Sequence, residues 1–467
     1  MRIDAAILDP LLLGAGLRDP ATWKPWLAVL KASFGLPLTT GEQAFFKAVS
    51  GARVAPVAPV SELWAIIGRR SGKSRVAAAV ATWTALQDHR LAPGETGHVL
   101  CLSASRAQAR TIFKYCLGFL EAAPMLAREV ESVTQEEIRL RSGVTIATHV
   151  NSFRTVRGRT ILAAIFDEIA FWRSDDGASA NPDKEVYRAV LPALAASGGP
   201  LVAISTPYRK TGLLHERHKS FFGVDDPNVL VIQGASQLFN PTLKQAMVDR
   251  AVRDDPEAAG AEWNAEFRSD IDAFLDDGQI SAAIDTARPR ELPPRPGISY
   301  AAFIDASGGR SDSYTMCIGH RHGDRFIADV VMGEAPPFNP SVVTSRLASV
   351  VQAYSCRKVT GDNFAAEWVA TAWRSQGLTY ERADMPASSL YLEALPAFMR
   401  EQISIPDHPI LVRELHGLER RTSRMGRDTV SHAPGSHDDY ANALAGCLRV
   451  AQARPNTAFW STYAGGF

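Results

Sequence analysis

Residues 64–74 of this 467-residue chain decide its fold, and they read Trp64-Ala-Ile-Ile-Gly-Arg-Arg-Ser-Gly-Lys-Ser74. An apolar run enters a glycine-containing loop, and a helical pattern follows at Val76–Leu86. In such a loop, backbone N–H groups converge on phosphate oxygens, and the helix N-terminus adds partial positive charge. Lys73 is expected to reach the β- and γ-phosphates of a nucleotide, and Ser74 to help hold Mg²⁺. The stretch therefore predicts a nucleotide-binding α/β domain.

The loop departs from the usual spacing of a phosphate-binding motif. The pattern G-x-x-x-x-G-K-[ST] would place its first glycine at Ile67, but Gly68 comes one residue late. A shortened loop is therefore expected, which leaves the roles of Arg69 and Arg70 open. A chance Gly-Lys-Ser on a surface turn is the alternative, but the position between a buried-type strand and a helix favours a phosphate loop. The candidate nucleotide-binding residues of the loop are Arg69, Arg70, Ser71, Gly72, Lys73 and Ser74.

Short apolar runs alternate with longer helical patterns from Leu63 onward. This alternation is typical of a domain built on a parallel sheet. A β-hairpin is expected at Ile138–Thr148, with its turn at Ser142-Gly143. The other expected strands are Leu63–Ile67, Val99–Leu102, Leu162–Phe166, Leu201–Ile204 and Val229–Ile232.

An acidic pair follows one of these strands. The apolar run Ile161–Phe166 ends in Asp167-Glu168. A carboxylate at the C-terminal end of an inner strand lies where the Mg²⁺ of a bound nucleotide would be, so Asp167 is expected to hold the metal through water. Glu168 is expected to orient and polarise the attacking water. An ordinary acidic helix cap is the alternative, which the phosphate loop in the same expected sheet makes less attractive.

Two further segments carry side chains suited to phosphate. Ser205-Thr206 ends another strand, near where a γ-phosphate sensor is useful, although a strand-end turn started by the following proline is the alternative. Arg154, Arg157 and Arg159 lie just before the acidic strand on a glycine-containing segment. An arginine there can stabilise the charge of phosphoryl transfer, contact DNA phosphate, or remain solvated.

The overall composition excludes some classes of protein. Lys+Arg and Asp+Glu both number 50, so net charge neither announces nor excludes a nucleic-acid partner. The five cysteines are scattered without a C-x-x-C pair, which argues against a zinc site or a disulfide framework. No apolar stretch approaches the length of a membrane span. We expect a soluble cytoplasmic protein.

A proline-rich segment, ARPRELPPRPG at 287–297, interrupts the pattern. Four prolines in so short a span cannot sustain a helix or an inner strand, so the segment is expected to be a stiff linker. New strands are expected after it, at Tyr300–Ile304, Tyr314–Gly319, Arg325–Val331 and Lys358–Thr360, with a helix at Pro340–Tyr354. The expected organisation is an N-terminal segment or lid at 1–60, a phosphate-loop domain at 61–286, the linker, a second domain at 298–453 and a tail at 454–467.

The second domain carries widely spaced carboxylates. Asp305 and Asp362 each end an expected strand, and Asp438 and Asp439 open a helical segment. Carboxylates that converge in this way suit two metal ions that clamp the attacking and leaving oxygens of a phosphodiester. Oxygen ligands fit Mg²⁺ or Mn²⁺. Each aspartate alone is equally well explained as a turn residue or an N-cap.

The order of these motifs resembles the large subunit of phage terminases, over roughly residues 35–450. The resemblance implies an N-terminal RecA-like (ASCE) ATPase sheet and a C-terminal RNase H-like nuclease domain. It makes Asp167 the Walker B acid, Glu168 the catalytic glutamate and Ser205-Thr206 the coupling motif. It also places an adenine-reading glutamine at Gln43 and an arginine acting across subunits at Arg157. The metal-binding acids of the nuclease would be Asp305, Asp362 and either Asp438 or Asp439, with Asp438 preferred for its spacing.

The resemblance also implies partners: ATP, double-stranded DNA, a portal protein, a small terminase subunit and further copies of the chain in a ring on the procapsid of a bacteriophage. A DNA helicase or repair ATPase with a fused nuclease is one alternative, and it would separate strands rather than move along intact duplex. A decayed DNA-binding or assembly factor is another. The retention of Lys73, Asp167 and Glu168 argues against decay.

Overall fold

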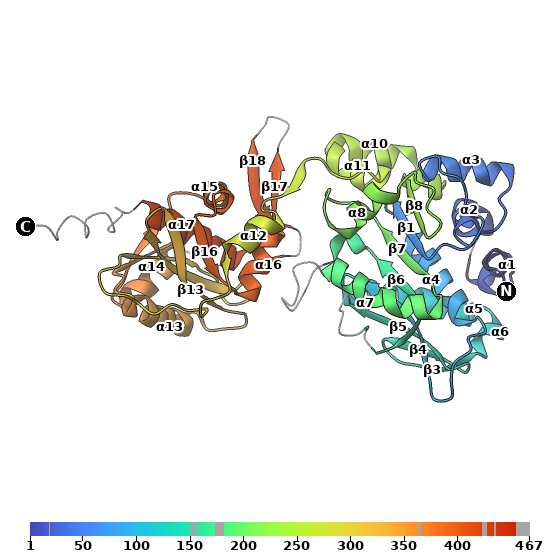
Figure 1. Cartoon of the computed structure of the whole chain (residues 1–467), viewed down its shortest axis with the longest axis horizontal. Coiled ribbons are helices and arrows are strands. Elements are labelled where there is room, and N and C mark those ends of the chain that lie inside the picture. Colours follow the sequence, from blue (N-terminus) through green and yellow to red (C-terminus); the bar gives the residue numbers. More distant parts are fainter. Residues whose placement is uncertain are drawn as a thin grey trace, which may run out of the picture. The chain divides into compact units, whose positions relative to one another are not determined.

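The structure is a computed structural model that describes residues 1–17, 19–150, 156, 158–172, 182–362, 366–422, 427–433 and 436–453. Its contacts divide the chain into two compact units, Met1–Ser269 and Asp270–Phe467. Each unit contains a large β-sheet with helices packed on it (Figure 1). The two units are described separately below.

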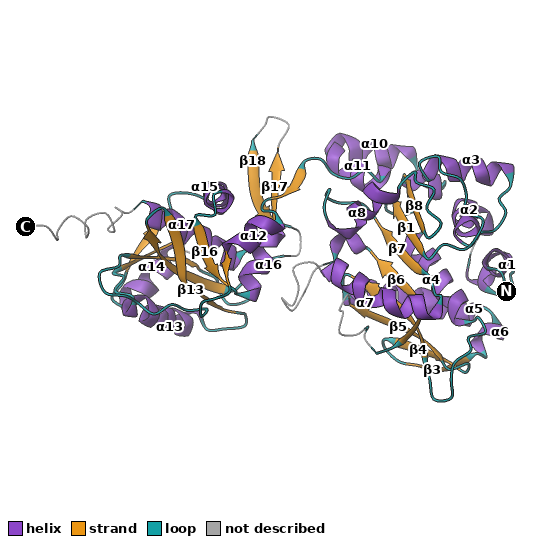
Figure 2. Ribbon diagram, viewed as in Figure 1, coloured by secondary structure: helices purple, strands orange, loops and turns teal. Residues whose placement is uncertain are grey.

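In the described part of the first unit, the sheet has eight strands in the order β3-β4-β5-β2-β6-β7-β1-β8. Strands β5, β2, β6, β7, β1 and β8 run parallel, and β3 and β4 add an antiparallel edge (Figure 2). The strand before the phosphate loop, β1, is separated from the acidic strand, β6, by β7 alone, which is the RecA-like (ASCE) order. The bounds are β1 Glu62–Ile67, β2 Gly97–Ser103, β3 Val130–Val133, β4 Glu137–Leu140, β5 Val144–Val150, β6 Thr160–Asp167, β7 Leu201–Ser205 and β8 Val229–Gly234.

Every strand expected in this region is present, because each is a buried apolar run of the length that an inner strand needs. Alternate residues of β1 point to opposite faces: Leu63 and Ile67 join one apolar core, and Trp64 and Ile66 the other. The expected hairpin is formed by β4 and β5, and Gly143 takes a positive φ of 84° at its turn.

Helices cover both faces of this sheet. Helices α1 to α5 contribute to the first core, and α7 and α8 to the second. The bounds are α1 Ile3–Leu8, α2 Lys24–Ser33, α3 Thr40–Val49, α4 Lys73–Ala85, α5 Arg106–Ala122, α6 Pro124–Ala127, α7 Pro182–Ser197, α8 Gly212–Phe221, α9 Ser236–Phe239, α10 Gln245–Asp254 and α11 Pro256–Asn264, with 3₁₀ turns η1 Leu13–Gly16, η2 Pro20–Trp23 and η4 Ile169–Phe171.

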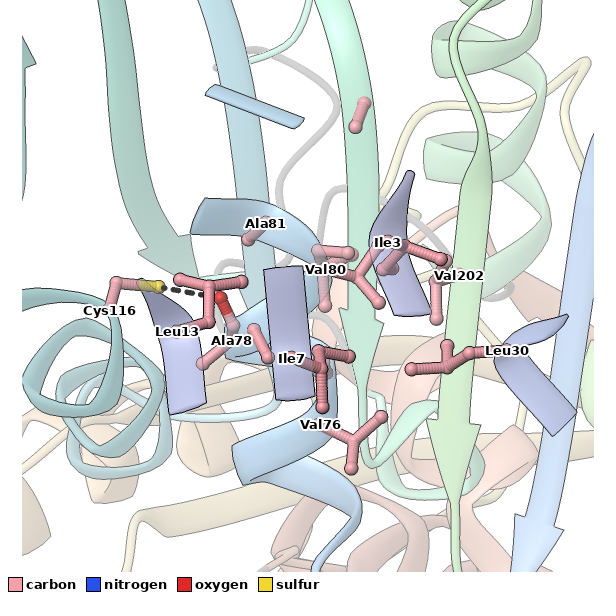
Figure 3. Packing of buried hydrophobic residues seen from close by; sticks show 14 of the residues in the cluster. Ile3, Ile7, Leu13, Leu30, Val76, Ala78, Val80, Ala81, Cys116 and Val202 are labelled. Carbon is pink, nitrogen blue, oxygen red and sulfur yellow. Dashed lines mark hydrogen bonds between the residues drawn. The ribbon is translucent and has the colours of Figure 1, made fainter. Parts of the chain in front are cut away.

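The N-terminal segment is part of the first core. Figure 3 shows Ile3 and Ile7 of α1 beside Val76 and Val80 of α4, and Leu30 of α2 belongs to the same buried cluster. All five side chains are buried. At about 1.5–3 kcal/mol for each fully buried aliphatic side chain, this packing is a substantial part of the stability of the unit.

In the described part of the second unit, the main sheet has seven strands in the order β10-β16-β13-β12-β11-β14-β15. Strands β11, β12 and β13 form an antiparallel meander, and β14 and β15 continue it in parallel with β11. This central order is that of an RNase H-like sheet. A separate three-stranded sheet has the order β18-β17-β9. The bounds are β9 Ile271–Ala273, β10 Ile284–Asp285, β11 Tyr300–Asp305, β12 Tyr314–His322, β13 Arg325–Glu334, β14 Lys358–Gly361, β15 Thr379–Arg382, β16 Ile403–Pro406, β17 Leu418–Thr422 and β18 Asp428–His432.

Two helical layers cover the second sheet. Helices α15, α16 and α17 share a core with Phe303 and Val331, whereas α13 and α14 pack with Ile304 and Met316 on the other face. The bounds are α12 Asp277–Ala283, α13 Pro340–Ala353, α14 Ala366–Ser375, α15 Ala387–Met399, α16 Pro409–Gly417 and α17 Asp439–Gln452. Among the described residues, no helix has both the length and the apolar character needed to cross a membrane.

The structure corrects the boundary expected at residue 286, because the units divide after Ser269. Strands β9 and β10 pair with β17 and β16, so both belong to the second unit. The proline-rich segment, expected to be a linker, is packed on that unit as well. The Leu292 N–H donates to the carbonyl of Asp329 at 2.9 Å, and Arg288 Nη2 donates to the carbonyl of Ala328 at 2.6 Å. Proline prevents regular structure here, but it does not prevent packing.

A fragment comparison tests this correction. We expect residues 298–453 to be less stable than residues 270–453, because the shorter fragment loses Phe274, Leu275 and Ile280 from the core. Each such loss costs about 1.5–3 kcal/mol of burial. Urea denaturation of both fragments measures the difference. Equal midpoints would restore the boundary at the prolines.

Candidate active sites

The first candidate site forms around Lys73, at the start of α4. Its side chain is 5% exposed, and its ammonium donates to the carbonyl oxygens of Ile67 at 2.8 Å and Gly68 at 3.1 Å. It also donates to the Thr206 hydroxyl at 3.0 Å, at the end of β7. Burial lowers the pKa of Lys73, and the charges of Glu168 and Asp167 oppose that shift. The ammonium therefore joins the phosphate loop to the neighbouring strand.

The loop has the backbone shape that its glycine allows. Gly72 has a φ of +87°, and a Cβ atom built there would lie 2.9 Å from the ring of Trp23. Trp26, which is buried, donates its indole N–H to the carbonyl of Ser71 at 2.7 Å. Arg70 also has a positive φ, of 62°. The N-terminal segment thus supports the loop directly.

A steric constraint explains why position 68 is a glycine. A Cβ atom at Gly68 would lie 2.2 Å from Ser236 Oγ and 2.6 Å from the carbonyl oxygen of Trp263. Gly68 is therefore needed where α9 and α11 approach the loop. The Arg69 N–H donates to the carbonyl of Glu262 at 2.6 Å. The side chains of Arg69 and Arg70 are exposed, and Arg69 Nη1 lies 3.4 Å from Glu262 Oε1.

The acidic pair lies at the end of β6, beside the loop. Asp167 is buried, with Oδ1 3.4 Å from Ser74 Oγ. Burial raises the pKa of Asp167 to about 7, aided by the charge of Glu168 and opposed by Lys73 and Ser74. Glu168 accepts the backbone N–H of Thr206 at 3.1 Å, and its Oε1 lies 3.9 Å from Lys73 Nζ. The carboxylate pair therefore faces both the lysine and the end of β7.

A cavity of about 550 Å³ opens along these groups, within the range of small-molecule sites. Its described lining is Arg69, Arg70, Ser71, Gly72, Lys73, Ser74, Arg75, Gln108, Tyr115, Glu168 and Phe171. A lysine ammonium at the N-terminus of α4 and the Ser74–Asp167 oxygen pair fit the phosphates of a nucleotide and a hard cation such as Mg²⁺. The structure thus brings five of the expected residues to one place: Lys73, Ser74, Asp167, Glu168 and Thr206.

One expected residue, Gln43, is absent from this lining as the structure describes it. Gln43 is exposed on α3, where its Nε2 donates to the carbonyl of Leu38 at 3.3 Å, and it is not among the described residues that line the cavity. Its helix is placed by a capping box between Thr39 and Glu42 rather than by the loop. Arg157 lies outside the described residues.

The second candidate site forms where β11, β14 and α17 meet. Asp305 ends β11 and Asp362 follows β14, and these parallel neighbours are in register at Ile304 and Gly361. Burial raises the pKa of Asp305 well above its usual range, and the charges of Asp362, Asp439 and Asp438 raise it further. The structure therefore brings all four expected acids into one electrostatic neighbourhood.

Hydrogen bonds hold three of these acids. Asn442 Nδ2 donates to Asp305 Oδ2 at 2.8 Å. The hydroxyl of Tyr391 donates to Asp438 Oδ2 at 2.9 Å, and the Ser313 N–H donates to Asp439 Oδ2 at 2.8 Å. A group of carboxylates around a buried member whose pKa they raise fits divalent cations bound through oxygen.

Both acids at the start of α17 act on Asp305, so the choice between Asp438 and Asp439 as a metal ligand stays open. The structure adds a contact that sequence reasoning missed: His437 Nδ1 lies 3.3 Å from Asp312 Oδ1, and these two with Asp439 form a group of potential ligands. Asn442 could have been found from the sequence, because it lies one helical turn after the acids.

Trp368 and Trp373 both lie on α14. Trp373 is fully buried and donates its indole N–H to the Tyr314 hydroxyl at 2.9 Å. Trp368 is 40% exposed.

A RecA-like unit with a lysine-centred phosphate loop, followed by an RNase H-like unit with a carboxylate cluster, defines a protein class that combines an ATPase fold with a nuclease fold. Residues 65–179 match the family described as terminase large subunit, T4likevirus-type, N-terminal. This match agrees with the resemblance seen in the motif order: residues 65–179, which lie in the first unit, are similar to the N-terminal domain of terminase large subunits.

Several solved structures are similar to the chain at low sequence identity. The large terminase of bacteriophage HK97 is 15% identical, with 96% of this chain and 98% of that chain covered and a TM-score of 0.41. The large terminase of a thermophilic bacteriophage is 12% identical, with 92% and 100% covered and a TM-score of 0.39. The large terminase nuclease of a second thermophilic phage, G20c, is 16% identical, with 38% and 97% covered and a TM-score of 0.34. No curated protein sequence matches the chain.

The acid cluster predicts a stability change in the absence of metal. Asp305→Asn keeps an oxygen for Asn442 but removes a charge that the other acids repel. Because the folded-state pKa is raised, the carboxylate destabilises the protein above its unfolded pKa of about 3.9, and increasingly so as the pH rises. Asp305→Asn is therefore expected to raise the thermal midpoint in EDTA at pH 8, with the gain shrinking toward pH 4. A lower midpoint at pH 8 would contradict the clustering.

Proposed function

We propose that the chain is an ATP-driven motor that moves double-stranded viral DNA into a procapsid, and a metal-dependent endonuclease that cuts concatemeric DNA. The observation that carries the proposal is that each unit has its own group of polar side chains suited to phosphate or metal chemistry. Lys73, Ser74, Asp167 and Glu168 converge in the first unit. In the second unit, the charges of Asp362, Asp438 and Asp439 act on the buried carboxyl of Asp305.

In the first site, the loop N–H groups and Lys73 would bind the phosphates of ATP, and Ser74 and Asp167 would hold Mg²⁺, which supplies charge neutralisation. Glu168 would orient the attacking water. Thr206 touches both ends of this arrangement, because its hydroxyl accepts from Lys73 and its N–H donates to Glu168. Loss of the γ-phosphate would therefore change the contacts of Lys73, Thr206 and Glu168 together. This supports a coupling role for Ser205-Thr206. Arg157, and Gln43 as an adenine reader, remain proposals from the resemblance.

In the second site, Asp305, Asp362 and Asp438 or Asp439 would hold Mg²⁺ or Mn²⁺, which supplies an activated nucleophile and stabilises the leaving oxygen. The hydrogen bonds from Asn442, Tyr391 and Ser313 would keep Asp305 and the two acids of α17 in place. Cleavage would require no side-chain nucleophile.

The proposal includes partners that follow from the family. A ring of chains would work at the portal protein of a procapsid, in the cytoplasm of a bacterial host cell, and a small terminase subunit would deliver the DNA. A helicase or repair-type ATPase with a fused nuclease remains the alternative. Robust unwinding of forked DNA in a strand-displacement assay would favour it.

The ATPase assignment is tested at the lysine. Lys73→Ala removes the buried ammonium and is expected to abolish ATP hydrolysis, while a metal-dependent cut on plasmid DNA persists. Phosphate release measures the first activity, and gel electrophoresis the second. A variant that hydrolyses ATP at the wild-type rate would refute the assignment.

The nuclease assignment is tested at the deepest acid. Asp305→Asn is expected to remove plasmid cleavage and to leave ATP hydrolysis intact, because only the second unit loses a ligand. Removal of divalent cations with EDTA should also remove cleavage by the wild-type protein. Cleavage that persists in the variant would show that these acids are not the metal site.

A further inference from the structure

The first turn of α17 is capped in an unusual way. Asp438 stands at the N-cap position, where an aspartate ordinarily accepts an N–H of its own helix with its carboxylate. Within the described residues around this turn, the Asp438 side chain makes no such bond. Its Oδ2 instead accepts the hydroxyl of Tyr391.

Glu414 of α16 does the capping in its place. Its Oε2 accepts the backbone N–H of Tyr440 at 2.7 Å and that of Ala441 at 2.9 Å. These are the second and third residues of α17, the donors that an N-cap side chain normally satisfies. Glu414 is 4% exposed, so water cannot readily substitute for it.

The consequence for the acid cluster is geometric. Because the helix donors are already occupied, Asp438 gains nothing by turning toward its own helix. Its carboxylate stays with Tyr391 and in the field of Asp305. Asp439 and Asn442 lie on the same turn and reach Ser313 and Asp305. One capping contact therefore fixes the turn that supplies three of the site's polar side chains.

We propose that Glu414 is a positioning residue of the nuclease site, which caps α17 so that the carboxylate of Asp438 remains available to a divalent cation. The inference rests on the proposed nuclease function. The role needs an acceptor oxygen rather than a negative charge, because both N–H groups bond to the same oxygen. Burial raises the pKa of Glu414 to about 8, and the N–H groups of Ala441 and Tyr440 oppose that shift.

Two substitutions separate the acceptor from the charge. Glu414→Ala removes the acceptor, and Asp438 is then expected to turn and cap its own helix. Glu414→Gln keeps a carbonyl oxygen in the same place. Glu381→Ala is the matched control, because Glu381 is an exposed glutamate of the same unit that pairs with Lys358.

The first measurement is Mn²⁺ binding to the full-length protein by electron paramagnetic resonance, which does not depend on cleavage. Glu414→Ala is expected to raise the half-saturating Mn²⁺ concentration by about 10-fold or more, as loss of an outer-shell partner typically does. Glu414→Gln and Glu381→Ala should remain within about threefold of wild type, well short of that outer-shell effect. A matching rise in the Mn²⁺ needed for half-maximal plasmid cleavage, with unchanged ATP hydrolysis, supports the same conclusion.

Two results would overturn the proposal. Wild-type Mn²⁺ affinity in Glu414→Ala would show that the cap does not position the acids, and equal damage in Glu414→Gln would show that charge matters instead. If Glu414→Ala fails to fold, Tyr391→Phe removes only the hydroxyl that holds Asp438, and it must weaken Mn²⁺ binding for the proposal to stand. A wild-type protein that binds Mn²⁺ but cuts no DNA would defeat the nuclease assignment alone. A wild-type protein that binds no Mn²⁺ would defeat both.

Discussion

The fold of the first unit must supply hydrogen-bond acceptors to one buried ammonium, that of Lys73. Leaving such a charge unpaired costs several kcal/mol, so the acceptors of Lys73 must come to it. They come from the end of β1 and from Thr206 at the end of β7, and the carboxylate of Glu168 approaches from β6. These three strands are consecutive in the sheet, in the order β6-β7-β1. The topology of the sheet and the chemistry of the loop are therefore two aspects of the same constraint.

The second unit shows the opposite electrostatic condition. Around Asp305, the neighbouring charges that act on its pKa are those of Asp362, Asp439 and Asp438, and all of them are negative. Such an arrangement is unfavourable by itself and becomes favourable when cations bind between the carboxylates. The first site contains a lysine cation and suits an anionic ligand. The second contains carboxylates and suits cations. Hydrogen bonds from neutral groups such as Tyr391 and Asn442 hold those anions without neutralising them.

Sequence reasoning succeeded where the signal is local. Strands such as β1 and β6 are continuous apolar runs, and Asp167-Glu168 can be located because the residues follow such a run directly. It failed where structure depends on distant partners. Strand β10 has two residues and pairs with β16 more than a hundred residues later, so no periodicity reveals it. Glu414 was missed for the same reason: its role exists only because α16 packs against the start of α17. The boundary at the prolines was wrong because composition indicates stiffness but not packing.

The shortened phosphate loop can now be explained by its supports. A loop that lacks the usual first glycine cannot rely on that residue for its curvature, and here other segments hold the backbone. Trp26 donates to the Ser71 carbonyl, the Glu262 carbonyl accepts the Arg69 N–H, and Asn240 donates to the Arg70 carbonyl at 2.7 Å. Three peptide groups of the loop are thus fixed before any ligand arrives, so less conformational entropy remains to be lost on binding. Gly68 has a related role, because α9 and α11 pack so closely against it that no side chain fits there. The conformation of the loop therefore depends on the segments packed against it as much as on the phosphate that would bind.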